Sequence, residues 1–405
     1  MRFVIAVLIA TVTTIPGSAQ TRPRGRDLGI PFPGRTGPAN AITDVAGIAV
    51  GHVTLIEGEG KLLTGQGPIR TGVTAILPRP RGNWDPVFAA TFNLNGNGDM
   101  TGINWIKESG FLEGPILLTG THSVGTVRDA AIQWQLRNGR DFVFTYPIVA
   151  ETFDSLNDAN GEHVKPVHAF QSLDRAKPGP VEEGAVGGGT GMQCNGFKGG
   201  IGTSSRVLSS QEGGYTVGVL VQCNYGGDLR ILGVPILPEV SDLGTCTILS
   251  QPLTRPWTRQ IPPCPQAGGA KADLAAADDQ GRGSIIVIVA TDAPLLPHQL
   301  ERIGRRVGMG LGRLGSRAGN SSGDLFLAFS TANAGAANPA GTPSLTMLPN
   351  DRINPLFSAT IDATEEAVVN AMLAAHTMTG ADGIRSFGLP GDRVVAALKK
   401  YNRMK

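Results

Sequence analysis

The dipeptide Gly283-Ser284 carries more potential chemistry than any other in the sequence. Ser284 opens an apolar, strand-like run at 284–290, directly after a tract that ends Asp-Asp-Gln-Gly-Arg-Gly283. If the chain were cut before Ser284, one residue would carry both a hydroxyl nucleophile and a free amine. An α-amino group has a pKa of about 7.7–8.0, so it can act as the base that a serine hydroxyl otherwise lacks. The dipeptide therefore predicts a self-generated N-terminal nucleophile, with an ordinary Gly-Ser turn as the alternative.

A second group of candidate catalytic residues lies in the run Asn320-Ser-Ser-Gly-Asp324, between an expected helix and an expected strand. Ser322 and Asp324 are two positions apart, so one loop can direct both side chains toward one site. We expect the Ser322 hydroxyl to hold the amine of Ser284, and Asp324 to orient and polarise that pair. A turn rich in serine, glycine and aspartate, without a catalytic role, is the alternative.

The same run contains a competing serine motif. Gly319-x-Ser321-x-Gly323 has the spacing of a nucleophile elbow. That elbow requires a strand before the serine and a helix after it, whereas the order expected here is helix, loop, strand. Ser284 therefore remains the candidate nucleophile.

Two more polar side chains stand where apolar runs end. Asn224 follows the run 215–221 and precedes a glycine turn. Its amide can donate to a developing oxyanion, an interaction typically worth about 3–4 kcal/mol. Glu151 ends the run 142–150 and can supply the anion that holds a substrate's free amine. A turn asparagine and a solvated glutamate are the alternatives.

Strands and helices must bring these residues together. Apolar runs between turns predict strands at 73–77, 87–92, 115–118, 142–150, 215–221, 284–290 and 324–330. Apolar residues at helical spacing predict helices at 101–108, 124–138 and 297–314. Asp362, with Glu365 three residues later, predicts a capped helix start in a segment that ends at Gly380. This mixture indicates an α/β protein with stacked sheets between helical layers.

The composition is that of a chain with a full core. The 405 residues are 41% hydrophobic and include 56 glycines. The net charge is +2 and no long basic run occurs, so neither nucleic acid nor a membrane is expected as a partner. Arg2, an apolar run over 3–10 and Gly-Ser-Ala19 are typical of a secretory signal at 1–19 and predict a periplasmic protein. A buried first strand is the alternative.

The cysteines, histidines and glycine loops indicate no cofactor. Cys246 and Cys264 flank a proline-rich stretch and are a candidate disulfide pair, while Cys194 and Cys223 are interpreted as small core residues. The histidines form no zinc-type group, so no metal is expected. The glycine-rich runs 95–102 and 186–191 match neither a P-loop nor a dinucleotide fingerprint, and we assign them to close backbone packing.

Several further runs, in one order along the chain, carry a family resemblance. They are Ile42-Thr-Asp-Val-Ala-Gly-Ile-Ala-Val-Gly-His52, Gly96-Asn-Gly-Asp-Met-Thr-Gly102, Thr121-His-Ser-Val-Gly125 with Arg128-Asp129, Gly187-Gly-Gly-Thr-Gly191, and Gly283-Ser-Ile-Ile-Val287 with Ala290-Thr-Asp-Ala-Pro-Leu-Leu-Pro-His-Gln299. From about Arg26 to the C-terminus, the sequence resembles the self-processing aminopeptidase family that includes β-peptidyl aminopeptidase and the L-aminopeptidase/D-amino-acid esterase-amidase.

The resemblance implies an α-β-β-α sandwich whose precursor cuts itself between Gly283 and Ser284. An α-chain of 20–283, with a linker over about 227–283, and a β-chain of 284–405 would stay associated, in assemblies of several αβ pairs. The resemblance makes Ser284 the nucleophile, Asn224 an oxyanion donor and Glu151 the carboxylate that binds the substrate amine.

Two positions depart from some members of that family. Ser322 and Asp324 match the supporting pair, but some relatives have glutamate where Asp324 stands. Phe153 falls in the substrate-binding region, where some relatives carry a tyrosine that is credited with oxyanion help. Phenylalanine cannot donate a hydrogen bond, so Asn224 and backbone N–H groups must suffice here.

The expected activity is release of N-terminal residues, β-amino acids among them, from peptides and amides with a free amine, through an acyl-enzyme. A D- or L-α-amino acid amidase or esterase would use the same machinery. An acyltransferase of the ornithine acetyltransferase type is disfavoured, because that family uses threonine as its nucleophile and the candidate here is a serine. A non-catalytic periplasmic binding protein is the alternative from another class, and it predicts an intact chain.

Overall fold

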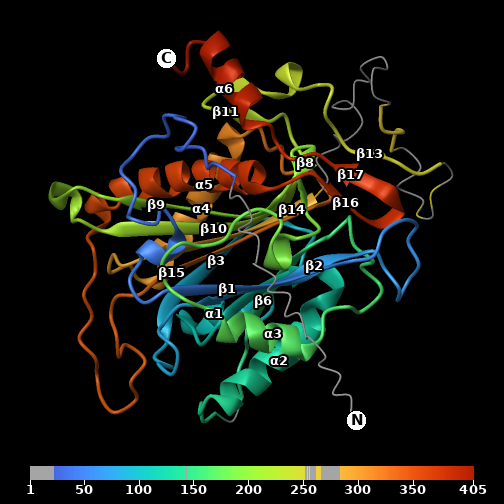
Figure 1. Ribbon diagram of the computed structural model, residues 1–405. Coiled ribbons are helices and arrows are strands. Elements are labelled where there is room, and N and C mark those ends of the chain that lie inside the picture. Colours follow the sequence, from blue (N-terminus) through green and yellow to red (C-terminus); the bar gives the residue numbers. More distant parts are fainter. Residues whose placement is uncertain (1–21, 143, 251–252, 254, 256–260, 266–282) are drawn as a thin grey trace, which may run out of the picture.

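The computed structural model describes residues 22–142, 144–250, 253, 255, 261–265 and 283–405, and its centre is a pair of stacked β-sheets (Figure 1). The expected signal segment 1–19 and the linker residues 266–282 lie outside the described residues. The four-stranded sheet has the order β1 (Ala49–Glu57), β2 (Ile69–Leu77), β5 (Ile116–Gly120), β6 (Ile148–Thr152). The six-stranded sheet has the order β4 (Phe111–Leu112), β3 (Val87–Gly96), β15 (Ser322–Ser330), β14 (Gly283–Thr291), β10 (Thr216–Tyr225), β9 (Gly200–Val207).

Helices cover the outer faces of both sheets. In Figure 1, α4 (Pro297–Arg313) and α5 (Asn354–Ala374) lie above the six-stranded sheet, and α2 (Val124–Arg137) and α3 (Pro166–Asp174) lie below the four-stranded one. The remaining described α-helices are α1 (Ile103–Ser109) and α6 (Gly391–Lys400). One apolar cluster fills the space between α4, α5 and their sheet, and a second lies between the two sheets. A third lies between the four-stranded sheet and the helices α2 and α3. The expected α-β-β-α sandwich is confirmed.

Several short strands lie outside the two large sheets and form small sheets of their own. They are β7 (Gln193–Cys194), β8 (Phe197–Lys198), β11 (Arg230–Ile231), β12 (Val234–Pro235), β13 (Cys246–Thr247), β16 (Met378–Thr379) and β17 (Ile384–Ser386). β13 pairs with β17, so this part of the expected linker is attached to the C-terminal part of the chain. Cys246 and Cys264 form a disulfide there.

The strand that contains the candidate nucleophile, as its second residue, is a central strand. β14 pairs with β10 on one side, antiparallel, and with β15 on the other, parallel. Its side chains alternate, as in any strand: Ile286 and Ile288 enter the layer between the sheets, while Ile285 and Val287 pack under the helices. Burial on both faces explains the continuous apolar run that predicted this strand.

Two expectations about secondary structure are wrong. The helix expected to start at Asp362 is the middle of α5, which begins at Asn354 and is buried on nearly all sides. Asp362 caps nothing; with Glu365 it pairs with Arg313 of α4, at 2.6 and 3.2 Å. The strand expected over 142–150 begins only at Ile148, because Pro147 has no N–H to donate to a ladder.

A third expectation, about the cysteines, is also wrong. Cys194 and Cys223 are buried, as expected, but they are not independent core residues, because they form a disulfide with each other. β7 and β10 lie side by side there, so residues 29 positions apart in sequence come into contact. The sequence signals for a disulfide in a proline-rich loop do not apply to this pair, which links two strands.

Candidate active site

The register of three strands gathers four of the candidate residues at one end of the six-stranded sheet. Ser284 lies opposite Asn224 on β10 and opposite Gly323 on β15. Gly283 lies opposite Ser322, the first residue of β15. Asp324 follows two residues later on the same strand. Residues far apart in sequence are therefore neighbours here because each begins or ends a paired strand.

The Ser284 side chain lies on the inter-sheet face and is 8% exposed, so its hydroxyl is shielded from most solvent. The backbone N–H of Gly323 donates to Ser284 Oγ at 3.1 Å. A hydrogen bond donated to a hydroxyl oxygen stabilises negative charge on that oxygen, because the charged form is the stronger acceptor. Gly323 was not expected as a site residue, although it lies in the run that supplied Ser322 and Asp324.

Gly283 has a backbone that only glycine adopts without strain. Its φ is +114°, and a Cβ added there would lie 2.2 Å from the carbonyl oxygen of Asn224. The bond between Gly283 and Ser284 thus runs close to β10, with an unshielded carbonyl on the side of the glycine.

The amide of Asn224 is oriented by one backbone contact. The N–H of Gln193 on β7 donates to Asn224 Oδ1 at 2.9 Å. The oxygen end of the amide is therefore occupied, and the NH₂ end is the one that can donate to a reacting carbonyl. The side chain is buried, so little water competes for that donor. Gln193 was also missed by sequence reasoning, because its contribution is a backbone group.

Ser322 and Asp324 lie beside the Gly283–Ser284 peptide bond, on the face of the sheet that packs against the helices. The Ser322 hydroxyl donates to Asp324 Oδ1 at 2.6 Å. Asp324 Oδ2 is buried and accepts no hydrogen bond from any described residue. Burial raises the pKa of Asp324, against the lowering effect of the Ser322 hydroxyl and of the Ile285 backbone N–H. The pair therefore reaches the backbone of β14, and Oδ2 can accept another donor.

Glu151 lies near the end of the edge strand β6, across the inter-sheet layer from β14. Its carboxylate accepts the backbone N–H of Asp99 at 2.9 Å and the hydroxyl of Thr121. Burial raises the pKa of Glu151, and these two hydrogen bonds act in the opposite direction. Neither Asp99 nor Thr121 was expected as a partner of Glu151, although both occur in the runs that carry the family resemblance.

The loop that contains Gly98 lies between Glu151 and Gly323 of β15. A Cβ added at Gly98 would lie 3.3 Å from Glu151 Oε1 and 3.4 Å from the Cα of Gly323. Only the backbone around Gly98 thus separates Glu151 from Gly323, whose N–H donates to Ser284. This agrees with the expectation of close packing at Gly98, and Gly102, Gly188 and Gly189 also lie against backbone, whereas a Cβ added at Gly96 would have nothing within 4 Å.

Phe153 follows β6 directly and is 38% exposed, so an apolar ring stands at the surface beside the buried Glu151. Its side chain offers no hydrogen-bond donor to the site. Among the described residues, no group of three or more histidine, cysteine, aspartate or glutamate side chains is arranged to hold a metal ion. No described helix combines the length and apolar character needed to cross a membrane.

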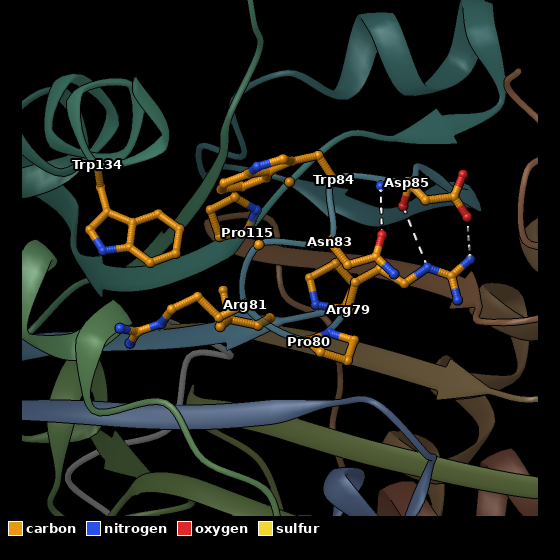
Figure 2. Close-up of a pocket in the computed structure, with 12 residues that line it drawn as sticks. Arg79, Pro80, Arg81, Asn83, Trp84, Asp85, Pro115 and Trp134 are labelled. Carbon is orange, nitrogen blue, oxygen red and sulfur yellow. Dashed lines mark hydrogen bonds and ion pairs between the residues drawn. The ribbon is translucent and has the colours of Figure 1, made fainter. Parts of the chain in front are cut away.

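A surface pocket between Arg79, Arg81, Trp84 and Trp134 lies away from these residues (Figure 2). It is built at the end of β2 and the start of β5, whereas Thr121 and Glu151 lie at the opposite ends of β5 and β6. Both of its arginines are already paired, Arg79 with Asp85 at 3.2 Å and Arg81 with Asp174 at 3.4 Å. The pocket therefore takes no part in the site around Ser284.

Comparisons with known proteins place the whole chain among peptidases. Residues 40–386 match the family described as peptidase family S58. The β-peptidyl aminopeptidase of Sphingosinicella microcystinivorans is 47% identical over 401 residues, covering 98% of this chain and 97% of that protein.

Two solved structures resemble the chain in fold as well as in sequence. The L-aminopeptidase D-Ala-esterase/amidase from Ochrobactrum anthropi, described as a variant of the Ntn hydrolase fold, has a TM-score of 0.82 and 40% identity, covering 95% of this chain and 100% of that one. A β-aminopeptidase from a Burkholderia species has a TM-score of 0.78 and 44% identity, covering 93% and 98%.

Proposed function

The chain belongs to peptidase family S58, and from this premise we propose that it cuts its own Gly283–Ser284 bond and then works as an aminopeptidase with Ser284 as nucleophile. The observation that carries the proposal is the strand register, which sets Ser284 between Asn224 and Gly323, with Ser322 and Asp324 beside the bond to be cut. Membership in a peptidase family favours this enzyme over a non-catalytic binding protein.

In the first step, Ser284 Oγ attacks the carbonyl carbon of Gly283. The O–H bond of Ser284 and the C–N bond break, the nitrogen takes up the hydroxyl proton and leaves as the new α-amine of Ser284, and the carbonyl stays attached to Oγ as an ester. Water then hydrolyses the ester to a Gly283 carboxylate and a free hydroxyl. Gly283 suits this step because glycine adopts a φ of +114° without strain and has no side chain to shield its carbonyl.

The new amine completes the mature site. It appears next to Ser322 and Asp324, and Asp324 Oδ2 is a buried acceptor with room for one more donor. The amine takes the proton from Ser284 Oγ as the hydroxyl attacks a substrate carbonyl. Asn224 and backbone N–H groups stabilise the oxyanion, and the acyl-enzyme is then hydrolysed by water.

Glu151 restricts the reaction to the first residue of a substrate, because its buried carboxylate binds the free ammonium group. Phe153, two residues after Glu151 and partly exposed, would contribute apolar contact to the substrate. We propose β-amino acids as the released residues, on the 47% identity to a β-peptidyl aminopeptidase. Amides and esters of D- or L-α-amino acids are the second candidate, on the likeness to the Ochrobactrum enzyme. Turnover of β-alanyl, D-alanyl and L-alanyl anilides, measured side by side, separates the two.

Intact mass under denaturing conditions tests the self-cleavage. We expect two polypeptides, the smaller beginning at Ser284, and for Ser284→Ala a single uncut and inactive chain. Efficient processing of the Ser284→Ala variant, or a folded wild type that stays in one piece, contradicts the proposal.

We also propose that the protein is exported to the periplasm and works as an assembly of αβ pairs. Its two disulfides fit an oxidising compartment. Cell fractionation combined with the mass of the larger polypeptide tests export, which requires a periplasmic product that lacks residues 1–19. Size-exclusion chromatography with light scattering gives the number of pairs, and a lone pair contradicts assembly.

A further inference from the structure

Lys198 is a fully buried cation that contacts the backbone next to Gln193, the residue whose N–H contacts the proposed oxyanion donor Asn224. It lies on β8, and its Nζ donates to three backbone carbonyls: Met192 at 2.6 Å, Gly199 at 2.8 Å and Gly189 at 3.3 Å. An ammonium group has three N–H donors, so these carbonyls satisfy it completely. In the part of the chain that the structure describes, no carboxylate forms an ion pair with Lys198.

An unpaired buried cation is costly. Desolvation lowers the pKa of Lys198 to about 7, so burial opposes the charge at neutral pH. An apolar side chain of similar volume would avoid that cost. What it could not do is donate to three carbonyls that converge on one point. Two of these carbonyls also accept a backbone N–H, Met192 from Gly199 at 2.9 Å and Gly189 from Met192 at 3.3 Å, and the ammonium adds one donor group that all three share. The ammonium therefore ties three backbone positions to one point.

The backbone that it holds leads directly to Asn224. Met192 precedes Gln193, whose N–H orients the Asn224 amide. The preceding run 187–191 has one side chain beyond glycine, Thr190, whose hydroxyl donates to the Gly187 carbonyl, and a Cβ added at Gly189 would lie 2.5 Å from the nitrogen of Ile201. Lys198 binds the middle of this glycine segment, at Gly189, and the residue that follows it, Met192.

A disulfide secures the other side of the same contact. Cys194 follows Gln193 and Cys223 precedes Asn224, so the Cys194–Cys223 bond ties together the two residues that flank the orienting hydrogen bond. The disulfide limits the separation of β7 and β10. It does not set the direction of the Gln193 N–H. That direction depends on the Met192–Gln193 peptide group, whose carbonyl oxygen accepts a hydrogen bond from Lys198.

We propose that Lys198 is a positioning residue for catalysis: it fixes the 189–193 backbone, and through the Gln193 N–H it aims the Asn224 amide at the reacting carbonyl. This inference rests on the oxyanion role of Asn224 in the proposed function. It adds a residue that touches neither the substrate nor Ser284.

A double-mutant cycle tests whether Lys198 acts through Asn224. Lys198→Met, Asn224→Ala and the double variant are compared for two rates, the appearance of the Ser284 fragment by mass and the turnover of a β-alanyl anilide. We expect Asn224→Ala to lower kcat by about 10²–10³-fold. Lys198→Met should lower kcat by about 10–100-fold with little change in KM, because an oxyanion develops only in the transition state. The double variant should be no slower than Asn224→Ala alone.

Arg206→Met is the matched control. Arg206 is another fully buried cation, but it lies toward the far end of β9 and pairs with Glu366 at 2.8 Å. Its loss should lower stability without an effect on kcat that depends on Asn224. The thermal unfolding transition of each variant is measured first, and all rates are then compared at a temperature below the lowest transition. If Lys198→Met does not fold, Lys198→Gln, which keeps two N–H donors, should fold and give an intermediate rate.

The outcomes separate this inference from the function on which it rests. A wild-type kcat for Lys198→Met, or effects of Lys198→Met and Asn224→Ala that multiply, overturns the positioning role and leaves the proposed function intact. A wild-type kcat for Asn224→Ala overturns the oxyanion assignment itself, and the inference with it.

Discussion

At the scale of single residues, the role proposed for Glu151 requires a negative charge that its surroundings disfavour. Burial raises its pKa, and among the groups around it Asp99 acts in the same direction, while His122 lowers it. Asp154, also buried, lies close enough for its own pKa to be raised further by Glu151. A buried carboxylate with a raised pKa makes the folded state hold its proton more tightly than the unfolded state does. Stability therefore falls as the pH rises through the pKa of the folded form.

Glu151→Gln should separate binding from processing. We expect self-cleavage at the wild-type rate and a loss of about 10–100-fold in kcat/KM, the range for a hydrogen bond to a charged group. Relative to this variant, the wild type should lose stability as the pH rises from acid to neutral, because only the wild type must ionise a buried carboxyl at position 151. Thermal unfolding across that pH range, with anilide turnover, checks both. A variant with wild-type kcat/KM removes Glu151 from the site.

Gly283→Ala should block or strongly slow self-cleavage. The new Cβ meets the carbonyl oxygen of Asn224 at 2.2 Å, and an alanine held at a φ of +114° is strained by about 1–3 kcal/mol. β14 must then shift relative to β10, which moves Ser284 from Asn224 and Gly323. Intact mass over time measures the uncut fraction. Gly341→Ala is the control, because a Cβ there has nothing within 4 Å, and it should process normally. Equal rates for both variants contradict this prediction.

At the scale of elements, the strands were easier to predict than the longest helix. The run 285–290 is apolar at every position because β14 is buried on both faces, and α4 shows one apolar stripe because only one side is covered. α5 has no such stripe, since its residues are buried all round by the sheet and by neighbouring helices. A helix of this kind has no amphipathic period, so in the sequence Asp362 and Glu365 resemble a cap, whereas in the structure they are partners of Arg313.

The two disulfides should differ in what their removal does. Replacing either pair by serine should lower the free energy of unfolding by about 2–4 kcal/mol. Cys194→Ser with Cys223→Ser should also lower kcat, because that bond flanks the contact between Gln193 and Asn224. Cys246→Ser with Cys264→Ser, which frees a loop beside β17, should leave kcat unchanged. Chemical denaturation and anilide turnover check the pair of variants, and equal losses of kcat contradict the distinction.

At the scale of the whole molecule, the bond before Ser284 lies within a continuous six-stranded sheet. β14 and β15 come from the part of the chain after the cut, and they are flanked by β10 and β3 from the part before it. Both parts also contribute to the apolar cluster under α4 and α5. We expect the cut protein to elute from a native sizing column at the volume of the uncut Ser284→Ala variant. Separation of the two polypeptides without denaturant contradicts this arrangement.

The sequence predicted the layers and the chemical types at the site, but not the contacts that orient them. Ser284, Asn224 and Glu151 stand at ends of apolar runs, where a polar residue is conspicuous. The groups that orient them are the backbone N–H of Gly323, Gln193 and Asp99, and a backbone donor has no side-chain signature. The Cys194–Cys223 pairing likewise depends on which strands become neighbours, and strand order is a property of the whole fold.

The proposed cleavage, which cuts a bond inside a sheet, would change the order of the folding reaction. Before the cut, β10, β14 and β15 belong to one polypeptide, and their pairing is a first-order process. Afterwards the same ladders join two molecules, so regaining them from the unfolded state requires an encounter whose rate depends on concentration. Dilute mature protein that has been melted and cooled will stay inactive, while the Ser284→Ala precursor regains its structure. The working protein therefore persists through the slowness with which it unfolds, and its lifetime is set by a kinetic barrier.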